Sequence, residues 1–390
     1  MAKGPRKPSR AQLREQLLAD AAATALPEAV DVCICGGGAA GLVAALCAAE
    51  AGASTVVLER DLACGRPILA TGNGRCNLTN LDVRPSVYNN PAFAEEVLGP
   101  GGLAANDVLD FFDACGLATG FESEDDSRVY PLSDQASSVR EVLLARAERA
   151  GVTLACAREV IGCGTGWVSY RELFSGMERT LAAKAIVLAV RDGFVPEGID
   201  AAPFSPALCP LACEGLPFEQ LDGRRSDTRV TLLRDGQAVA QERGEVLFRS
   251  YGLSGIVIFN FSRIAIPGDT LLLDLAPLVN EDSFASMVGA AGSARGVVDP
   301  AIVEVLGDVK RVSCAVVGKA QTEHAQVRQG GLLTEQFDPS TLMARGMPGL
   351  FAAGEVLDID GPCGGYNLTW AWKSGLVAGA AAAAFAKARA

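Results

Sequence analysis

One segment near the N-terminus constrains the fold of this chain more than any other, because it joins an apolar run to a glycine-rich turn. Residues 31–35 (DVCIC) have the length and hydrophobicity of a buried parallel strand. Residues 36–41 (GGGAAG) follow directly, and apolar side chains then recur at helical spacing from Leu42 to Ala49. A strand, a G-x-G-x-x-G turn and a helix in this order predict a dinucleotide-binding unit.

Each glycine of this turn has a physical reason to be glycine. Gly36 permits the tight turn, Gly38 lets a pyrophosphate approach the backbone, and Gly41 lets the helix lie close to the strand. The N-terminus of the helix supplies backbone N–H donors and the positive end of the helix dipole. The turn is therefore expected to bind a diphosphate.

A second strand at 55–58 (TVVL) ends at Glu59, 23 residues after Gly36. This spacing is close to the roughly 20 residues expected for the acid that accepts hydrogen bonds from an adenosine ribose. A glycine turn without a nucleotide is the alternative, but all parts of the unit agree with nucleotide binding. The unit alone does not distinguish FAD from NAD.

The polar segment 64–80 (CGRPILATGNGRCNLTN) favours FAD. FAD is long, and beyond its pyrophosphate the ribityl chain and isoalloxazine need a further polar loop. Arg66 and Arg75 are candidates to contact phosphate or flavin carbonyl oxygens, while Asn77 and Asn80 are candidates to brace the loop. An ordinary surface turn is the alternative, since Gly and Asn favour turns as well.

A segment near the C-terminus has matching features. Residues 350–353 (LFAA) predict a buried strand that ends at Gly354-Glu355, where a backbone N–H or the Glu355 carboxylate is expected to hold the ribityl or pyrophosphate region. Gly364-Gly365 then open a helix whose N-terminus, aimed at the flavin N1–C2=O edge, would stabilise an anionic reduced flavin. A glycine-rich helix start selected for packing alone is the alternative.

These segments resemble the signatures of the BaiN/YhiN-type FAD-dependent oxidoreductases, a family of the two-dinucleotide-domain flavoprotein superfamily. The resemblance rests on residues 65–80, on 244–255 (GEVLFRSYGLSG), and on 349–358 with 361–368, and it covers most of the chain after about Val30. It implies an α/β fold in which a Rossmann-type, glutathione-reductase-like FAD-binding domain carries an inserted, partly β substrate or cap domain.

The predicted organisation has three parts: an N-terminal extension at 1–29, a discontinuous FAD-binding domain at 30–192 and 331–390, and the inserted domain at 193–330. The extension is interpreted as a loose helix. Further predicted elements are helices at 108–112, 139–147 (capped by Ser133 or Ser137) and 283–290, and strands at 151–154, 158–161, 167–170, 177–180, 185–189, 229–233 and 271–273.

The residues expected to bind FAD lie in these segments, together with the end of the strand at 185–189 and the backbone near Val160, which contacts adenine in the family's pattern. They are Gly36, Gly38, Ala39, Ala40, Gly41, Glu59, Arg60, Arg66, Gly72, Gly74, Arg75, Cys76, Asn77, Val160, Ala189, Gly354, Glu355, Gly365, Asn367 and Leu368. Tyr251 is the candidate proton donor opposite flavin N5, with Tyr366 second, and a packing role is the alternative for both. Cys76 and Cys363 are interpreted as small packing residues near the flavin.

The chain also departs from the family it resembles. Members usually end the strand at 185–189 with Ala-Thr-Gly-Gly, whereas this chain has the bulkier Val190 and Arg191 there. Pro67 replaces the usual lysine, and the region before Gly331 is shortened. We expect FAD binding to survive these changes and the substrate cavity to differ.

Composition limits the partners and the metal chemistry. The 46 acidic and 34 basic residues give a net charge of −12, which argues against nucleic acid and against a membrane surface as partners. The 12 cysteines contain no C-x-x-C pair, and His324 is the single histidine, so we predict no metal site and interpret the cysteines as buried apolar residues of a cytoplasmic protein. No signal peptide or spanning segment is predicted, and the alanine-rich tail is interpreted as the packed end of a helix.

The favoured function is that of an FAD-dependent oxidoreductase in which transient NAD(P)H reduces FAD, and hydride passes to an activated C=C bond or a similar acceptor on a small molecule. The resemblance suggests oxo-steroid or bile-acid alkenes as acceptors. An FAD-binding protein with little catalysis, such as a sensor or a degenerate paralogue, is the alternative, motivated by Val190 and Arg191. A tRNA-modifying flavoprotein is disfavoured by the acidic charge.

Overall fold

The computed structural model describes residues 9–100, 103–123, 126–191 and 194–389. The chain divides into two compact units, formed by 1–204 with 330–390 and by 205–329. Both boundaries fall within a two-stranded sheet made of β10 (Ala201–Ala207) and β17 (Val327–Leu332). The role of residues 193–330 as a substrate or cap domain stays a prediction.

The first unit is built on a seven-stranded sheet in the order β6-β2-β1-β9-β8-β7, with β18 paired to the end of β9. The strands β6, β2, β1, β9 and β18 are parallel, whereas β8 is antiparallel to β7 and β9. Their bounds are β1 (Ala29–Cys35), β2 (Thr55–Leu58), β6 (Thr153–Ala155), β7 (Arg158–Gly164), β8 (Trp167–Glu172), β9 (Glu178–Leu188) and β18 (Leu350–Ala352). The predicted Rossmann-type α/β fold is therefore confirmed.

The strand β9 corrects one prediction. The sequence pattern predicts two strands, at 177–180 and 185–189, but residues 178–188 form a single strand. Its first half pairs with β8, and its second half pairs with β1 on one side and β18 on the other. No glycine or proline interrupts this stretch, so nothing forces a turn within it.

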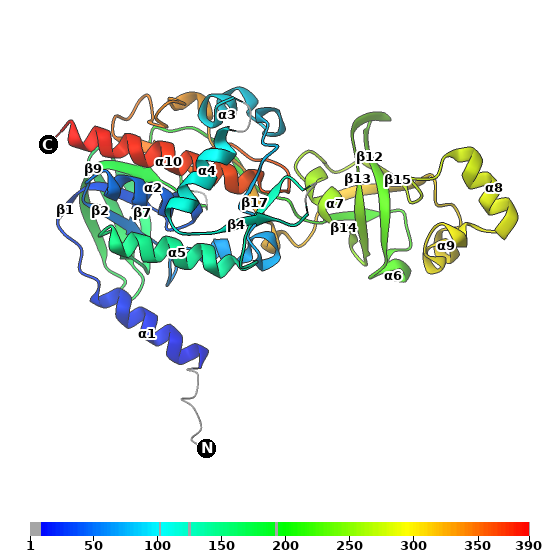
Figure 1. Cartoon of the computed structure of the whole chain (residues 1–390), viewed down its shortest axis with the longest axis horizontal. Coiled ribbons are helices and arrows are strands. Elements are labelled where there is room, and N and C mark those ends of the chain that lie inside the picture. The colour runs from blue at the N-terminus through cyan, green and yellow to red at the C-terminus, as the bar shows by residue number, and fades with distance from the viewer. Residues whose placement is uncertain (1–8, 101–102, 124–125, 192–193, 390) are drawn as a thin grey trace, which may run out of the picture. The chain divides into compact units, whose positions relative to one another are not determined.

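Two helices that are distant in sequence pack side by side against this sheet, α2 (Ala39–Glu50) and α10 (Tyr366–Lys387), as Figure 1 shows in blue and red. Their close approach depends on glycine, because a Cβ atom on Gly375 would lie 2.6 Å from the carbonyl oxygen of Ala40. Within the described ranges, no helix is both long and apolar enough to cross a bilayer.

The first unit also contains the helices α3 (Pro91–Leu98), α4 (Leu103–Ala114) and α5 (Ala136–Arg149). A small sheet joins β3 (Thr79–Asn80), β5 (Arg128–Pro131) and β4 (Thr119–Phe121). The capping prediction for α5 is wrong. Gln135 is its N-cap residue and makes no side-chain cap, Ser137 lies inside the helix, and Ser133 donates instead to Ser138 Oγ at 2.7 Å.

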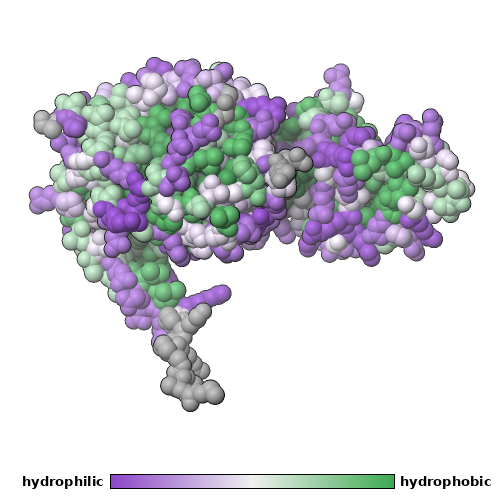
Figure 2. Space-filling model, viewed as in Figure 1, coloured by the Kyte–Doolittle hydropathy of each residue, from purple (hydrophilic) through white to green (hydrophobic). Residues whose placement is uncertain are grey.

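The described part of the N-terminal extension forms α1 (Arg10–Ala23), which begins with a capping box between Ser9 and Gln12. Its C-terminal end is held by the buried Arg158, which donates to the carbonyl oxygens of Ala21 (3.2 Å) and Thr24 (2.8 Å). Figure 2 shows hydrophobic residues on α1 beside polar ones, and Ala21 is its one buried residue. Two hydrogen bonds from Arg158 therefore hold the C-terminal end of the helix.

The second unit is a closed antiparallel barrel with its own core, in the order β11-β14-β13-β12-β15-β16. The prediction of a partly β domain is confirmed, and closure into a barrel is an addition to it. Its elements are β11 (Leu211–Glu214), α6 (Phe218–Leu221), β12 (Arg225–Arg234), β13 (Gln237–Arg249), β14 (Gly252–Ser254), α7 (Ile256–Phe261), β15 (Thr270–Asp274), α8 (Glu281–Ala291), α9 (Pro300–Leu306) and β16 (Val312–Lys319).

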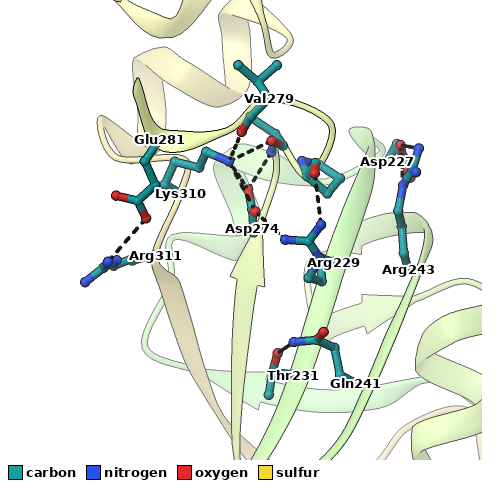
Figure 3. Close-up of polar contacts among 12 residues, drawn as sticks. Asp227, Arg229, Thr231, Gln241, Arg243, Asp274, Val279, Glu281, Lys310 and Arg311 are labelled. Atoms are coloured by element: carbon teal, nitrogen blue, oxygen red, sulfur yellow. Dashed lines mark hydrogen bonds and ion pairs between the residues drawn. The ribbon is translucent and has the colours of Figure 1, made fainter. Parts of the chain in front are cut away.

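A polar network holds the chain that leaves β15 (Figure 3). Lys310 Nζ donates to the carbonyl oxygens of Val279 (2.6 Å) and Ala276 (2.8 Å) and lies 3.2 Å from Asp274 Oδ1. Arg229 approaches Asp274 from β12, with Nη1 3.4 Å from Oδ2. Because Lys310 is well buried and its charge is paired, these contacts have a structural role in the second unit.

Candidate functional site

The predicted diphosphate-binding residues lie together where β1, β9 and β18 end. The parallel register places Leu188 beside Cys35 on one side and beside Ala352 on the other. The residues that follow the three strands therefore emerge at one edge of the sheet, where ligands of open α/β folds bind. They are the glycine turn 36–38, Ala189 to Arg191, and Ala353 to Glu355.

The three glycines of the turn have different surroundings. Gly36 has a φ of 106°, and its N–H donates to the carbonyl oxygen of Leu58 at 2.8 Å. A Cβ atom on Gly41 would overlap the carbonyl oxygen of Gly36, whereas a Cβ atom on Gly38 would meet no atom within 4 Å. Gly38 is the N-cap residue of α2, so the backbone is open where a phosphate would approach the helix N-terminus. This surface fits the predicted diphosphate.

Glu59 ties the glycine turn to the end of β2. Its Oε2 accepts from the N–H of Gly37 at 2.6 Å, and its Oε1 accepts from the N–H of Asp61 at 2.7 Å. Burial raises the pKa of the Glu59 carboxyl above its ordinary value, although these two hydrogen bonds lower it. Glu59 thus lies beside the turn, where its predicted role as ribose acceptor requires it, and it also braces the turn.

The two arginines after β2 lie on the surface. Arg60 is exposed, and the Arg66 side chain is 58% exposed with Nη1 3.4 Å from Asp61 Oδ2. Their contact with a phosphate stays a prediction. Pro67 lies in the first turn of η1 (Arg66–Gly74), where its missing N–H costs no helical hydrogen bond, so its replacement of lysine is compatible with the backbone.

Two thiols contact each other beside the glycine turn. Cys64 Sγ lies 3.7 Å from Cys156 Sγ, and a Cβ atom on Gly37 would lie 2.5 Å from Cys64 Sγ. This pair was not predicted, because 92 residues separate its members in the sequence. Nine of the 12 cysteines are buried and three are partly buried, as expected for packing residues.

The loop at 72–76 follows a strongly turned path. Gly72, Asn73, Gly74 and Cys76 all have positive φ values, between 54° and 87°. The Cys76 side chain is fully buried, and burial raises the pKa of its thiol to about 11. Cys76 is therefore protonated at neutral pH, in agreement with its interpretation as a packing residue.

The segment after this loop is joined to the start of α10. With its amide oriented to satisfy both neighbours, Asn77 donates to the carbonyl oxygen of Thr79 and accepts from the N–H of Gly365, each at 3.1 Å. Asn80 donates to the carbonyl oxygen of Gly364 at 2.8 Å. Two further contacts are made by residues that sequence reasoning missed: Thr79 with Thr369 (Oγ1 to Oγ1, 2.7 Å) and Trp372 Nε1 with the carbonyl oxygen of Leu78 (2.9 Å).

Two side chains expected to bind FAD contact protein groups. Arg75 stacks on Tyr130, with Cζ 4.3 Å from the ring centroid, donates to Asp134 Oδ1 at 2.5 Å, and lies 3.0 Å from Glu122 Oε1. Asn367 closes its own loop, since its Oδ1 accepts from the N–H of Gly361 and its Nδ2 donates to the carbonyl oxygen of Gly361, both at 2.8 Å. Contacts of Arg75 and Asn367 with the flavin stay predictions.

The turn at Gly354 is held by α10. Its N–H, one of the groups expected to contact the cofactor, donates to Ser374 Oγ at 2.9 Å, and its carbonyl oxygen accepts from Trp370 Nε1 at 3.1 Å. A Cβ atom on Gly354 would lie 2.8 Å from Ala40 Cβ, so this turn contacts the first turn of α2. Trp370 and Ser374 are one helical turn apart, so they lie on the same face of α10. This spacing was the sequence signal that could have predicted their shared contact with Gly354.

The remaining predicted residues belong to other segments of the chain. Val160 is half-buried in β7 and pairs with Tyr170, Leu368 is half-buried in α10, and Tyr366 is the first residue of that helix. Tyr251 belongs to the second unit, where its carbonyl oxygen accepts from the N–H of Cys213 at 3.0 Å. Burial raises the pKa of both Tyr251 and Tyr366, so each is protonated at neutral pH.

The chain matches a known protein family over most of its length. The model of the HI0933-like protein Rossmann domain matches residues 30–381. The chain is 31% identical to a 3-dehydro-bile acid delta(4,6)-reductase of Clostridium scindens, over 90% of this chain and 98% of that protein. It is 26% identical to a ribosomal RNA dihydrouridine synthase of Escherichia coli, over 89% and 96%.

Among solved structures, a 3-ketosteroid-delta4-(5alpha)-dehydrogenase of Rhodococcus jostii RHA1 matches with a TM-score of 0.48 and 18% identity, over 93% of this chain and 98% of that one. The family model spans most of the chain, and the bile acid reductase is similar over nearly its whole length. The chain therefore belongs to the HI0933-like family of FAD-dependent, Rossmann-type oxidoreductases.

Proposed function

We propose that this protein is a reductase that uses NAD(P)H to reduce bound FAD and delivers hydride to an electron-poor C=C bond of a small molecule. The observation that carries the proposal is the 31% identity with a bile acid reductase over 90% of the chain. The name of the second relative points to the same bond type, because dihydrouridine is uridine with its ring C=C bond reduced.

The residues of the first unit support binding of the dinucleotide. The open backbone at Gly38 and the start of α2 are suited to the diphosphate, and Glu59 is suited to the adenosine ribose. Glu355, at the end of β18, is suited to the ribityl hydroxyls. When bound, FAD supplies the hydride transfer itself.

Tyr251 is the proposed proton donor for the acceptor. A tyrosine phenol is protonated at neutral pH, as proton donation requires, and burial raises the pKa of Tyr251 further. Tyr251→Phe is expected to lower acceptor turnover roughly 100-fold, within the range for removal of a general acid, without slowing reduction of the flavin by NAD(P)H. Stopped-flow measurement of the two half-reactions checks this, and equal loss in both half-reactions would reject the assignment.

The substrate is proposed to be a steroid-like or other small activated alkene. Two relatives are named ribosomal RNA dihydrouridine synthases, and they favour a uridine within RNA as a second candidate substrate. The net charge of −12 favours the small molecule, because acidic surfaces repel phosphate backbones. That nucleic acid is not a partner stays a prediction.

The test is anaerobic flavin reduction followed by oxidation with defined acceptors. The purified protein is expected to show flavin absorbance, to be reduced by NADH or NADPH, and to be reoxidised by a 3-oxo-4,6-diene of the bile-acid type. Unmodified ribosomal RNA tests the second substrate. If dithionite reduces the flavin but neither nicotinamide does, and no acceptor reoxidises it, the protein binds FAD without this catalysis.

A further inference from the structure

Arg191 and Glu355 form an ion pair between two strand ends that are distant in sequence. Arg191 Nε lies 3.4 Å from Glu355 Oε2, and the two side chains are 39% and 25% exposed. Each residue lies three positions beyond the end of its strand, β9 for Arg191 and β18 for Glu355. Because these strands are parallel neighbours, their ends bring the two charges to the same edge of the sheet.

This ion pair lies beside the predicted diphosphate surface. On one side, a Cβ atom on Gly36 would lie 3.2 Å from the backbone nitrogen of Val190, the residue before Arg191. On the other side, Gly354, the residue before Glu355, contacts Ala40 in the first turn of α2. The backbones that carry both charges therefore contact the glycine turn or the helix start that follows it.

The charges of Arg191 and Glu355 are expected to affect the affinity for the cofactor diphosphate. A carboxylate beside a diphosphate opposes its binding, because like charges at short range repel. The Arg191 guanidinium offsets the charge of Glu355 and adds a cation at the same edge, and guanidinium is well suited to phosphate oxygens. Glu59 brings a second carboxylate to this region, which increases the need for a cation.

We propose that Arg191 binds the cofactor diphosphate and that Glu355 positions its side chain for that contact. The inference rests on the proposed function, since it requires a dinucleotide at this surface. The family usually has Ala-Thr-Gly-Gly at this strand end, where this chain has Val190 and Arg191. In this chain, the charged side chain of Arg191 would contribute to the affinity for the diphosphate.

The experiment measures equilibrium dissociation constants of the full-length apoprotein for FAD, ADP and riboflavin. Arg191→Ala is expected to weaken FAD and ADP binding by about tenfold to a hundredfold, as for loss of a charge-assisted hydrogen bond. It is expected to leave riboflavin binding unchanged, because riboflavin has no phosphate. Arg191→Lys is expected to recover part of the loss, and Arg191→Ala is expected to reduce the salt dependence of FAD binding.

Two further variants separate this role from a structural one. Arg179→Ala removes an arginine within β9, the strand that Arg191 follows. Arg179 pairs with Glu172 at 3.8 Å, and its removal is expected to leave all three constants unchanged. Glu355→Gln combined with Arg191→Ala is expected to show a non-additive effect on FAD binding, because the two side chains act together.

Equal or tighter binding of FAD by Arg191→Ala, with wild-type binding intact, overturns this inference alone. An equal loss of riboflavin affinity also overturns it, since the effect would then not involve the phosphates. Failure of the wild-type protein to bind FAD or ADP rejects the proposed function and this inference together. Thermal unfolding of each variant confirms that the folded protein is compared.

Discussion

Two regions of the first unit are both predicted to contact FAD, and they differ in how much of their polar surface already contacts protein. At the glycine turn, a Cβ atom added to Gly38 would have no other atom within 4 Å, so the space beyond this residue is open. In the region of 77–80 and 361–369, the side chains of Asn77, Asn80, Thr369 and Asn367 all bond to other protein groups.

The difference shows that polar residues near a predicted cofactor are not automatically its ligands. Buried polar groups need partners, so a loop of Asn and Thr against a helix start satisfies itself first. Gly38 differs from these residues because it opens a helix N-terminus and has open space beside its backbone, so a ligand can approach the N–H groups there. We therefore expect the diphosphate to bind at the glycine turn, and the hydrogen bonds of the second region to hold the loop against α10.

The largest expected effect comes from Gly41→Ala, which tests packing at the glycine turn. The added methyl group would overlap the carbonyl oxygen of Gly36 and lie 3.3 Å from Ala189 Cβ. We expect a loss of about 3 kcal/mol of stability, as for an overpacked core, measured by urea unfolding. Gly289→Ala, in α8 where the methyl group meets no atom within 4 Å, is the control and should be neutral or slightly stabilising. Equal effects at both positions would contradict the packing.

Gly38→Ala should separate binding from folding. The methyl group enters open space and the φ of −79° suits alanine, so stability should fall by less than about 1 kcal/mol, the cost of a weaker N-cap residue. FAD affinity should fall at least about tenfold, equivalent to about 1.4 kcal/mol, because the methyl group occupies the path of the diphosphate. Titration of the apoprotein with FAD measures this, and unchanged affinity would place the diphosphate elsewhere.

Thr369→Val tests the second region. Thr79 and Thr369 are fully buried, and Thr369 also lies 3.0 Å from the carbonyl oxygen of Gly365. Removing the Thr369 hydroxyl leaves Thr79 without its partner and should cost about 1–3 kcal/mol of stability. Thr79→Val should cost less, because Thr369 still donates to Gly365. FAD affinity should change less than in Gly38→Ala, and a larger change would make this region the main binding surface.

The smallest effect on stability is expected for Asp31 in β1, which pairs with Lys184 in β9 at the end of these strands opposite the glycine turn. Lys184 (2.9 Å) and Ser54 lower the pKa of Asp31 from 3.8 to about 2. Because the folded-state pKa is lowered, Asp31 contributes stability above about pH 4 that is lost as the pH falls toward 2. Asp31→Asn should cost no more than about 1 kcal/mol at pH 7, since the pair is partly exposed. Urea unfolding from pH 7 to pH 3 should show the difference shrinking, with FAD affinity unchanged throughout.

Much of the fold was predictable because its signals are local. The apolar runs of β1, β2 and β18, the glycine turn, and the helical spacing of α2 and α10 each lie within one short segment. Two predictions were wrong because they depend on tertiary contacts. Residues 178–188 form the single strand β9 and not two strands, and α5 begins without the predicted serine cap. The β9 segment is continuous because two different strands pair with successive halves of it on one side.

The sequence by itself determined the dinucleotide turn, the spacing of Glu59 and the family, because these depend on residue types at fixed short distances along the chain. Only the tertiary structure decided which polar groups are already paired, such as Arg75 with Asp134, and which distant ones meet, such as Arg191 with Glu355 and Cys64 with Cys156. The physical reason is that strand register and helix packing set these distances, and neither is encoded in the spacing of any single segment.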